Sequence, residues 1–369
     1  MVRATRDPFT AKHIVILKLL PTLLIPCLLS AFLPQAAAQS GEGQATYRVT
    51  FNATWSPSSH PGAFPGGAHF SPLTGATHSS ATTLWSPGGM ASNGIESMAE
   101  TGSVSTLQSE VNGLILAGTA GEIIHGPGAG ATDSVSTTFT VSADFPLASI
   151  VTMIAPSPDW FVGVHDVALL ENDAWVDQKV MPLFAYDSGT DNGSQFTSSN
   201  QNSVPQQPLH LITTGPLAGA AQFGTFTFER LHSSLEIGVC NNPAGSLALS
   251  GSPQIGQNLS FQFHNPLGTT STPAATALGI SFLPLPGLPC GVTVPGLGLA
   301  GPGNPGDLVI SNLDLLFFGP MWNGSPVSTT FPIPMDPSLV GLEFYAQGAL
   351  IDAAAVLGAT SALHVVVGA

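Results

Sequence analysis

Three aspartates in two loop-like segments, Asp159, Asp187 and Asp191, are the residues whose type and spacing suggest chemistry. Both segments are rich in Pro, Gly, Ser and Asn, which is typical of loops. The apolar runs between them, at 161–164, 167–170 and 180–185, predict buried strands. A chain that leaves one acidic loop, crosses a sheet and returns to the other can bring the three carboxylates together.

Three gathered carboxylates repel each other unless a cation joins them. Hard oxygen ligands in Gly/Ser/Asn loops suit Ca²⁺, which takes about six to eight oxygens. The spacing is not that of an EF-hand, because the sixth position from Asp187 is Asn192 and the twelfth is Ser198. The alternative is that Asp187 and Asp191 only form turns in a solvated loop, the commoner role of Asp in such segments. The residue types leave both interpretations open.

The same stretch carries a series of ordered motifs. They are Pro-Ser-Pro-Asp-Trp-Phe-Val-Gly-Val at 156–164, Trp175-Val176, Tyr-Asp-Ser-Gly-Thr-Asp-Asn-Gly at 186–193 and Pro205-Gln206. Upstream of them lie Tyr47–Phe51, Trp55, His60-Pro61, Phe64-Pro65, His69–Leu73, Gly75–His78, Leu84-Trp85, Ala91-Ser92, Gly94, Ala99–Gly102 and Phe145-Pro146. Over roughly Ala45 to His232 the chain resembles the spondin N-terminal domain family, of the F-spondin and mindin type.

The resemblance implies a C2-like β-sandwich used in extracellular adhesion. It also implies a Ca²⁺ ion held by the Asp of Pro-Asp-Trp and both Asp of the Asp-Ser-Gly-Thr-Asp motif, which are Asp159, Asp187 and Asp191 here. Two features depart from the family pattern. His165 and then Asp166 follow the Val-Gly-Val run where the family often has Asp directly, and cysteines common in animal members are absent.

Composition predicts an all-β protein of two β-sandwich domains. Gly and Pro number 41 and 32, charged residues are only 8%, and Thr, Ser, Val and Phe occur in short runs, which favours many strands and turns. We expect the first sandwich at 45–232, with one short helix within 99–116, and a second at 240–369. In the second, Leu247 and Leu249 and then Leu259, Phe261 and Phe263 alternate as in strands.

The second half resembles a short C-terminal module of secreted bacterial proteins, those of planctomycetes in particular. The segments that carry this resemblance are 332–341, Tyr345-Ala-Gln347 and Val365-Val-Val-Gly368. It names no activity. Beyond residue 38 only Cys240 and Cys290 remain, so in an oxidising compartment we expect them to bond. Closing such a loop contributes roughly 4 kcal/mol in the chain-entropy model.

Residues 1–38 read as a cleaved secretory signal peptide. Four basic residues accompany the apolar run 14–33, and Ala36-Ala37-Ala38 offers a cleavage site. The mature chain would keep three basic residues against 21 acidic residues, a formal net charge of −18. Such a charge disfavours nucleic acid and anionic membranes. We therefore expect a secreted or cell-surface protein, with no membrane insertion after cleavage, that binds an extracellular protein or glycan.

Other chemistries find less support. His60, His69 and His78 recur every nine residues in loops, but the close His pairs of zinc sites are missing. The nucleophile-elbow, zinc-protease and phosphate-loop motifs are absent from the sequence, so no catalytic residue is assigned. The competing hypotheses are a secreted hydrolase or glycan-active enzyme with a structural Ca²⁺, and a purely structural envelope protein.

The signal-peptide prediction can be checked on exported protein. We expect N-terminal sequencing to find the mature chain beginning near Gln39, because the small-residue cleavage site ends at Ala38. Recovery of exported protein that still begins at Met1 would contradict it.

Overall fold

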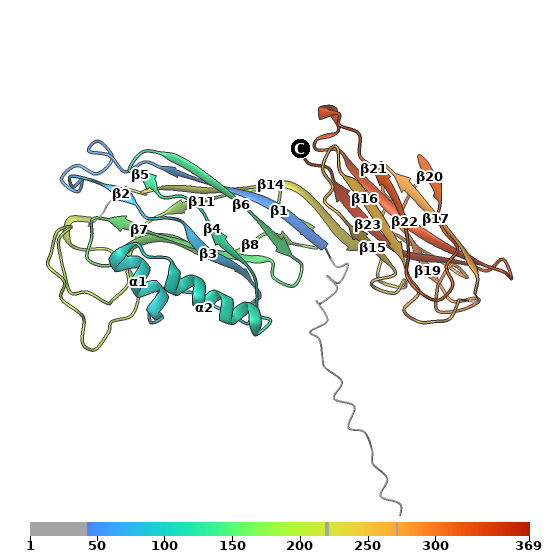
Figure 1. The fold of residues 1–369 in the computed structure, drawn as a ribbon, viewed down its shortest axis with the longest axis horizontal. Coiled ribbons are helices and arrows are strands. Elements are labelled where there is room, and N and C mark those ends of the chain that lie inside the picture. Colours follow the sequence, from blue (N-terminus) through green and yellow to red (C-terminus); the bar gives the residue numbers. More distant parts are fainter. Residues whose placement is uncertain (1–42, 218–220, 271) are drawn as a thin grey trace, which may run out of the picture. The chain divides into compact units, whose positions relative to one another are not determined.

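The computed structural model describes residues 43–217, 221–270 and 272–369, and strands dominate it (Figure 1). The all-β, sandwich-like architecture expected from the sequence is confirmed. The predicted signal segment lies outside the described residues. Among those residues, no helix has the length and apolarity needed to cross a membrane.

The first large sheet contains eight antiparallel strands. Their order is β20-β17-β22-β23-β14-β1-β6, and β11 also pairs with β14. The strands are β1 (Gly43–Ala53), β6 (Ser134–Ser142), β11 (Gln178–Leu183), β14 (Gly224–Ile237), β17 (Ala274–Ser281), β20 (Leu315–Phe318), β22 (Glu343–Asp352) and β23 (Leu357–Val366).

The second large sheet faces β1, β6, β11 and β14 and has the order β13-β12-β8-β7-β2-β5, with β3 paired to β7 and β4. Its strands are β2 (His69–Phe70), β3 (Thr74–His78), β4 (Ala120–His125), β5 (Ala129–Gly130), β7 (Leu147–Ala155), β8 (Trp160–Ala168), β12 (Ala185–Asp187) and β13 (His210–Leu211). The smaller elements are β9 (Leu170–Glu171), β10 (Ala174–Trp175), β15 (Leu247–Ser250), β16 (Asn258–Phe263), β18 (Val292–Val294), β19 (Gly306–Leu308), β21 (Val327–Pro332) and the 3-10 helices Gly215–Leu217 and Pro337–Leu339.

The core between these two sheets follows from strand alternation. In β1, Tyr47, Val49 and Phe51 are fully buried while the residues between them are partly or wholly exposed. Inward side chains recur every second residue because successive side chains of a strand point to opposite faces. Phe51 meets Phe70 edge-on at a centroid distance of 4.8 Å and Phe226 at 5.3 Å. Aromatic contacts of this kind join the two sheets into one sandwich.

Two helices, rather than the single short helix expected, cover the other face of the second sheet. They are α1 (Asn93–Thr101) and α2 (Ser105–Leu116), which lie along β3, β4 and β7 in Figure 1. The Ser92 hydroxyl caps α1 by accepting from the Ile95 amide, and left-handed Gly102 ends it. The apolar residues at 99–116 have a weak helical period that predicts one helix. In the structure this range contains the end of α1, the Gly102 cap and the whole of α2.

Three strand boundaries differ from the expectation. The runs 161–164 and 167–170 largely belong to one strand, β8, whereas 180–185 is divided between β11 and β12 in different sheets. The alternation of Phe and Thr at 223–228 predicts a strand ending near residue 230, but in the structure this strand, β14, continues to Ile237 and pairs with both β1 and β23. A single strand thus crosses residue 232, and the division into independent domains at 45–232 and 240–369 stays a prediction.

In the second half, β15, β16 and β21 form a three-stranded sheet whose Phe261 and Phe263 are buried together with Leu278 of β17 and Leu350 of β22. This second core also obeys the alternation predicted for 259–263. Cys240 and Cys290 are bonded, which confirms the disulfide prediction.

Truncating the centre of the first core should be costly. We expect Phe51→Ala to lower the free energy of unfolding by about 3–5 kcal/mol, because it removes a fully buried ring and leaves a cavity. Urea unfolding followed by tryptophan fluorescence measures this. Val204→Ala, at an apolar residue that is 89% exposed, should stay close to the parent protein. A loss below about 1 kcal/mol for Phe51→Ala would contradict the packing described.

Candidate metal centre

Strand pairing brings the two predicted acidic loops together at the ends of two neighbouring strands of the second sheet. Asp159 directly precedes β8, and Asp187 is the last residue of β12. The strands β8 and β12 are antiparallel neighbours, with Asp187 opposite Trp160. Asp159 is the neighbour of Trp160 in the chain and therefore lies close to Asp187. The loop that follows β12 then brings the Asp191 backbone into contact with the Asp159 carboxylate.

Asp159 is fully buried, and the loop after β12 folds around one of its oxygens. Oδ2 of Asp159 accepts from the Ser188 hydroxyl at 2.9 Å, the Thr190 amide at 2.8 Å and the Asp191 amide at 3.1 Å. Oδ1 of the same carboxylate is buried and has no hydrogen-bond partner within the described residues. An unsatisfied buried carboxylate oxygen is costly, so this atom marks a place where a further ligand would stabilise the fold.

Asp187 and Asp191 both close turns in this loop. Asp187 Oδ1 accepts from the Gly189 amide at 2.8 Å, and Asp191 accepts from the Gly193 and Gln201 amides at 2.6 and 2.8 Å. Gly189 has φ +76° and lies so close to the Gln207 carbonyl that a Cβ would collide with it. Asp187 and Asp191 thus form turns, as the alternative interpretation of the sequence expects. They also lie near Asp159.

A fourth carboxylate, Glu100, joins the group from the end of α1. Its side chain lies near the Thr190 hydroxyl, and its Oε1 is buried without a hydrogen-bond partner in the described part of the chain. Burial raises the pKa of Glu100, and the nearby carboxylates of Asp191 and Asp159 add to this effect. Glu100 belongs to the Ala99–Gly102 motif, but its residue type and position in the sequence do not indicate that it lies near the acidic loops.

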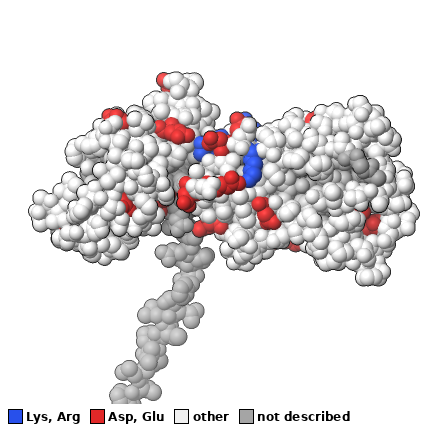
Figure 2. Space-filling model, turned by 180° about the vertical axis from the view of Figure 1, so that it is seen from behind, with Lys and Arg blue, Asp and Glu red and all other residues white. Residues whose placement is uncertain are grey.

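The electrostatic surroundings of the group are negative. Burial, followed by repulsion from Asp159, raises the pKa of Asp187 to about 6. Among the described residues, Lys and Arg number only three, and each pairs elsewhere: Arg48 with Glu229, Lys179 with Glu171, and Arg230 with Asp177. Figure 2 shows blue side chains only in a narrow zone where red ones accompany them. No Lys or Arg in the described chain is paired with the Asp159 group.

The donor set fits a hard cation. It consists of carboxylate and hydroxyl oxygens, two of the carboxylate oxygens are buried without partners, and no Lys or Arg is paired with the group. As the side chains now stand, no three His, Cys, Asp or Glu within the described ranges are arranged to hold one ion. The carboxylates do not converge on one point because the oxygens of Asp187 and Asp191 accept hydrogen bonds from backbone amides and from the Trp160 indole.

Trp160 and Trp175, which both lie between the ends of the 156–193 stretch, have different surroundings. Trp160 is buried and donates its indole N–H to Asp187 Oδ2 at 3.2 Å, so it borders the group. Trp175 is also buried but donates to the Ser234 carbonyl of β14. Because both rings are buried, neither forms an exposed aromatic platform for a ligand.

The regularly spaced histidines do not converge. His60 bonds to the Ala221 carbonyl, His69 to the Gly67 carbonyl and His78 to the Ser149 hydroxyl. His165 and Asp166, which depart from the family pattern, lie where the β7–β8 register shifts, and Asp166 has φ +52°. This feature is a β-bulge, in which the strand accommodates an additional residue.

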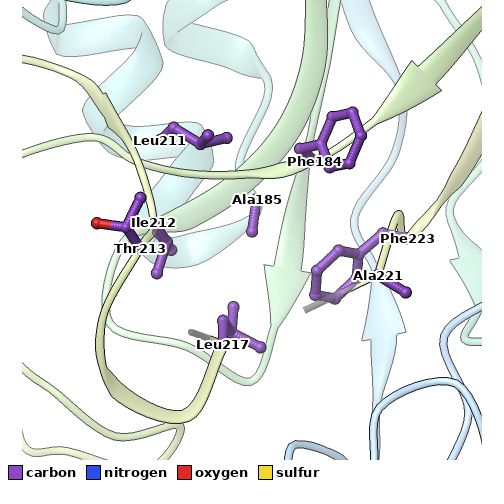
Figure 3. Close-up of a pocket in the computed structure, with 8 residues that line it drawn as sticks. All are labelled: Phe184, Ala185, Leu211, Ile212, Thr213, Leu217, Ala221 and Phe223. Atoms are coloured by element: carbon purple, nitrogen blue, oxygen red, sulfur yellow. The ribbon is translucent and has the colours of Figure 1, made fainter. Parts of the chain in front are cut away.

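A separate hollow of about 430 Å³ lies beside β12, and its lining is mostly apolar (Figure 3). Phe184, Ile212, Leu217 and Phe223 are among the lining residues, and Thr213 is the one hydroxyl residue among the described ones. The described residues that line this hollow include no carboxylate, so they do not form a hard-cation site.

Half of the chain resembles known proteins in sequence. Residues 45–232 match the Spondin_N family. Spondin-2 of Homo sapiens is 34% identical over 200 residues, which cover 52% of this chain and 59% of that protein. Spondin-1 of Gallus gallus is 34% identical over 179 residues, which cover 47% of this chain and 22% of that protein. The matched region therefore spans less than two thirds of either relative.

The buried His60 should make stability depend on pH. Burial lowers the pKa of His60 below its usual 6.5, and the bond to Ala221 only partly opposes this. As the pH falls through about 6.5, the unfolded chain takes up the proton first, so the stabilising contribution present above that pH is lost below it. We expect His60→Gln, which keeps a donor for the Ala221 carbonyl, to show a smaller drop in melting temperature between about pH 7.5 and 5. The exposed His69→Gln variant should keep the full drop, and equal drops in all three proteins would contradict the assignment.

Proposed function

The chain belongs to the Spondin_N family, and from that premise we propose that its first sandwich is a calcium-binding adhesion domain. Asp159, Asp187 and Asp191 would hold the ion, and Glu100 would supply a further oxygen. When bound, the double positive charge of Ca²⁺ would offset part of the negative charge of these carboxylates and hold the loop after β12 against Asp159.

The protein is secreted, as are its relatives Spondin-1 and Spondin-2. An extracellular setting suits weak calcium sites, since extracellular modules bind with dissociation constants of about 10⁻⁴–10⁻³ M. A binding role, rather than catalysis, also suits the sequence, in which no nucleophile or acid–base motif was found. The partner we propose is an extracellular or cell-surface protein or glycan. The likeness of the second half to a module of secreted bacterial proteins likewise stays a proposal.

The observation that carries the proposal is the unpartnered Oδ1 of Asp159. The carboxylate is fully buried, its other oxygen is held by the Ser188–Asp191 loop, and no cation of the described chain reaches it. A buried charge is tolerated when it is paired or coordinates a metal. Asp187 and Asp191 have free lone pairs beyond their turn hydrogen bonds, since each carboxylate has about four acceptor sites. They can therefore keep their turns and still turn an oxygen toward the ion.

Calcium should stabilise the folded chain, and the Asp159→Asn variant should lose this effect. At about one hundred times the dissociation constant, binding to the folded state alone contributes about 2.7 kcal/mol, seen as a rise in melting temperature over the sample in EDTA. Asn keeps one oxygen for the loop amides but removes a charge. We therefore expect the variant to melt at or above the parent temperature in EDTA and to gain little from Ca²⁺.

Asp173→Asn provides the matched control, because this exposed aspartate has φ +57°, a conformation that Asn also adopts, and lies outside the group. It should keep the full calcium shift. Zn²⁺ should substitute poorly, since the proposed ligands are all hard oxygens. Identical melting curves for the parent protein in EDTA and in millimolar Ca²⁺ would defeat the calcium proposal.

A further inference from the structure

The outermost strand of the first large sheet, β20, has a free hydrogen-bonding edge. Within the described residues β20 pairs only with β17, and it lies at the margin of its sheet in Figure 1. The Gly319 amide donates to the Thr276 carbonyl at 3.1 Å. Antiparallel ladders alternate, so Leu315 and Phe317 direct their backbone groups at β17, while those of Leu316 and Phe318 point outward.

The side chains of β20 are apolar on both faces. Phe317 is directed at the core, where it stacks on Phe331 of β21 at a centroid distance of 4.8 Å. Leu316 and Phe318 are opposite Gly279 and Ala277 and face away from the core, with exposed fractions of 46% and 76%. Apolar side chains so exposed beside a free edge indicate a surface that another strand covers.

The usual protection of such an edge is missing. Proteins protect exposed edge strands with Lys, with inward-pointing charges or with bulges. Residues 240–369 contain no Lys or Arg, and in 313–321 the one charged residue is Asp314. Exposed Leu313 and Met321 extend the apolar surface at both ends of β20.

We propose that β20 pairs with β20 of a second copy of this chain, in antiparallel orientation about a two-fold axis at Phe317. In this register Leu316 of one copy is opposite Phe318 of the other, and their outward amides and carbonyls form four new backbone hydrogen bonds. Because the outward amides and carbonyls lie at Leu316 and Phe318, on either side of Phe317, the two-fold axis brings donors of one copy opposite acceptors of the other.

The charges and the geometry both favour a second copy as the occupant. The same register places Asp314 opposite Pro320 of the partner, so no two carboxylates meet. Pro320 has no amide hydrogen and ends the ladder there. The β20 edge of each copy is covered by the other copy, so no β20 edge remains for a third copy and the assembly ends at a dimer. At the opposite end of the sheet, β6 exposes Ser134, Ser136 and Thr138, which lack the apolar side chains for such a contact.

Sedimentation velocity of the exported chain over a wide concentration range tests the proposal. We expect a monomer–dimer equilibrium, and we expect Phe318→Lys to raise the dimer dissociation constant by about tenfold or more. Phe318 is exposed, so the variant should melt near the parent temperature. Leu116→Lys, at a residue of α2 that is 90% exposed, makes the same kind of change elsewhere and should leave the equilibrium unchanged. A monomer at every concentration, or an undisturbed dimer in Phe318→Lys, would overturn the proposal.

Residue-resolved hydrogen exchange separates this surface from any other dimer contact. The amides of Leu316 and Phe318 should become protected as concentration rises, whereas those of Leu315 and Phe317, already bonded to β17, should be protected throughout. A dimer in which Leu316 and Phe318 exchange as fast as in the monomer would place the contact elsewhere and refute the pairing.

Discussion

A carboxylate removed from water must be solvated by the protein, and Asp159 imposes that requirement on the first sandwich. Its Oδ2 accepts from donors that all come from Ser188 to Asp191, so the loop after β12 is folded by the aspartate it covers. The same wrapping draws Asp187 and Asp191 toward Asp159. The fold thereby gathers negative charge at a point where none of the cations of the described chain is paired.

The rest of the sandwich determines where this arrangement can form. Pairing of β8 with β12 sets the two loops side by side, and the inward rows of β1, β7 and β14 hold both sheets at a fixed separation. On the outer face, α1 packs Ile95 and Met98 against the second sheet, so that Glu100 reaches Thr190. A helix is therefore part of the acidic group, although neither acidic loop contains one.

A low content of charged residues has a different consequence in each half of the chain. In the first half it leaves the acidic group without a counter-ion from the protein. In the second half it leaves a sheet edge without the lysines that normally discourage strand addition. Both features follow from having only three Lys and Arg residues beyond position 38, all of them before residue 240.

The sequence by itself determined the fold class, the inward face of β1 and the disulfide partners, and it singled out three aspartates that the fold places near one another. Alternation and turn residues are local properties, and two cysteines allow only one pairing. Only the tertiary structure decided that 180–185 is divided between two sheets, that the Trp175 indole bonds to β14, and that Glu100 lies near Asp159. A period of two tells which face a residue occupies but not which strand lies beside it. The unpartnered oxygen of Asp159 likewise could not be predicted from the sequence. Which of its two oxygens is bonded depends on how residues about thirty positions away fold against it.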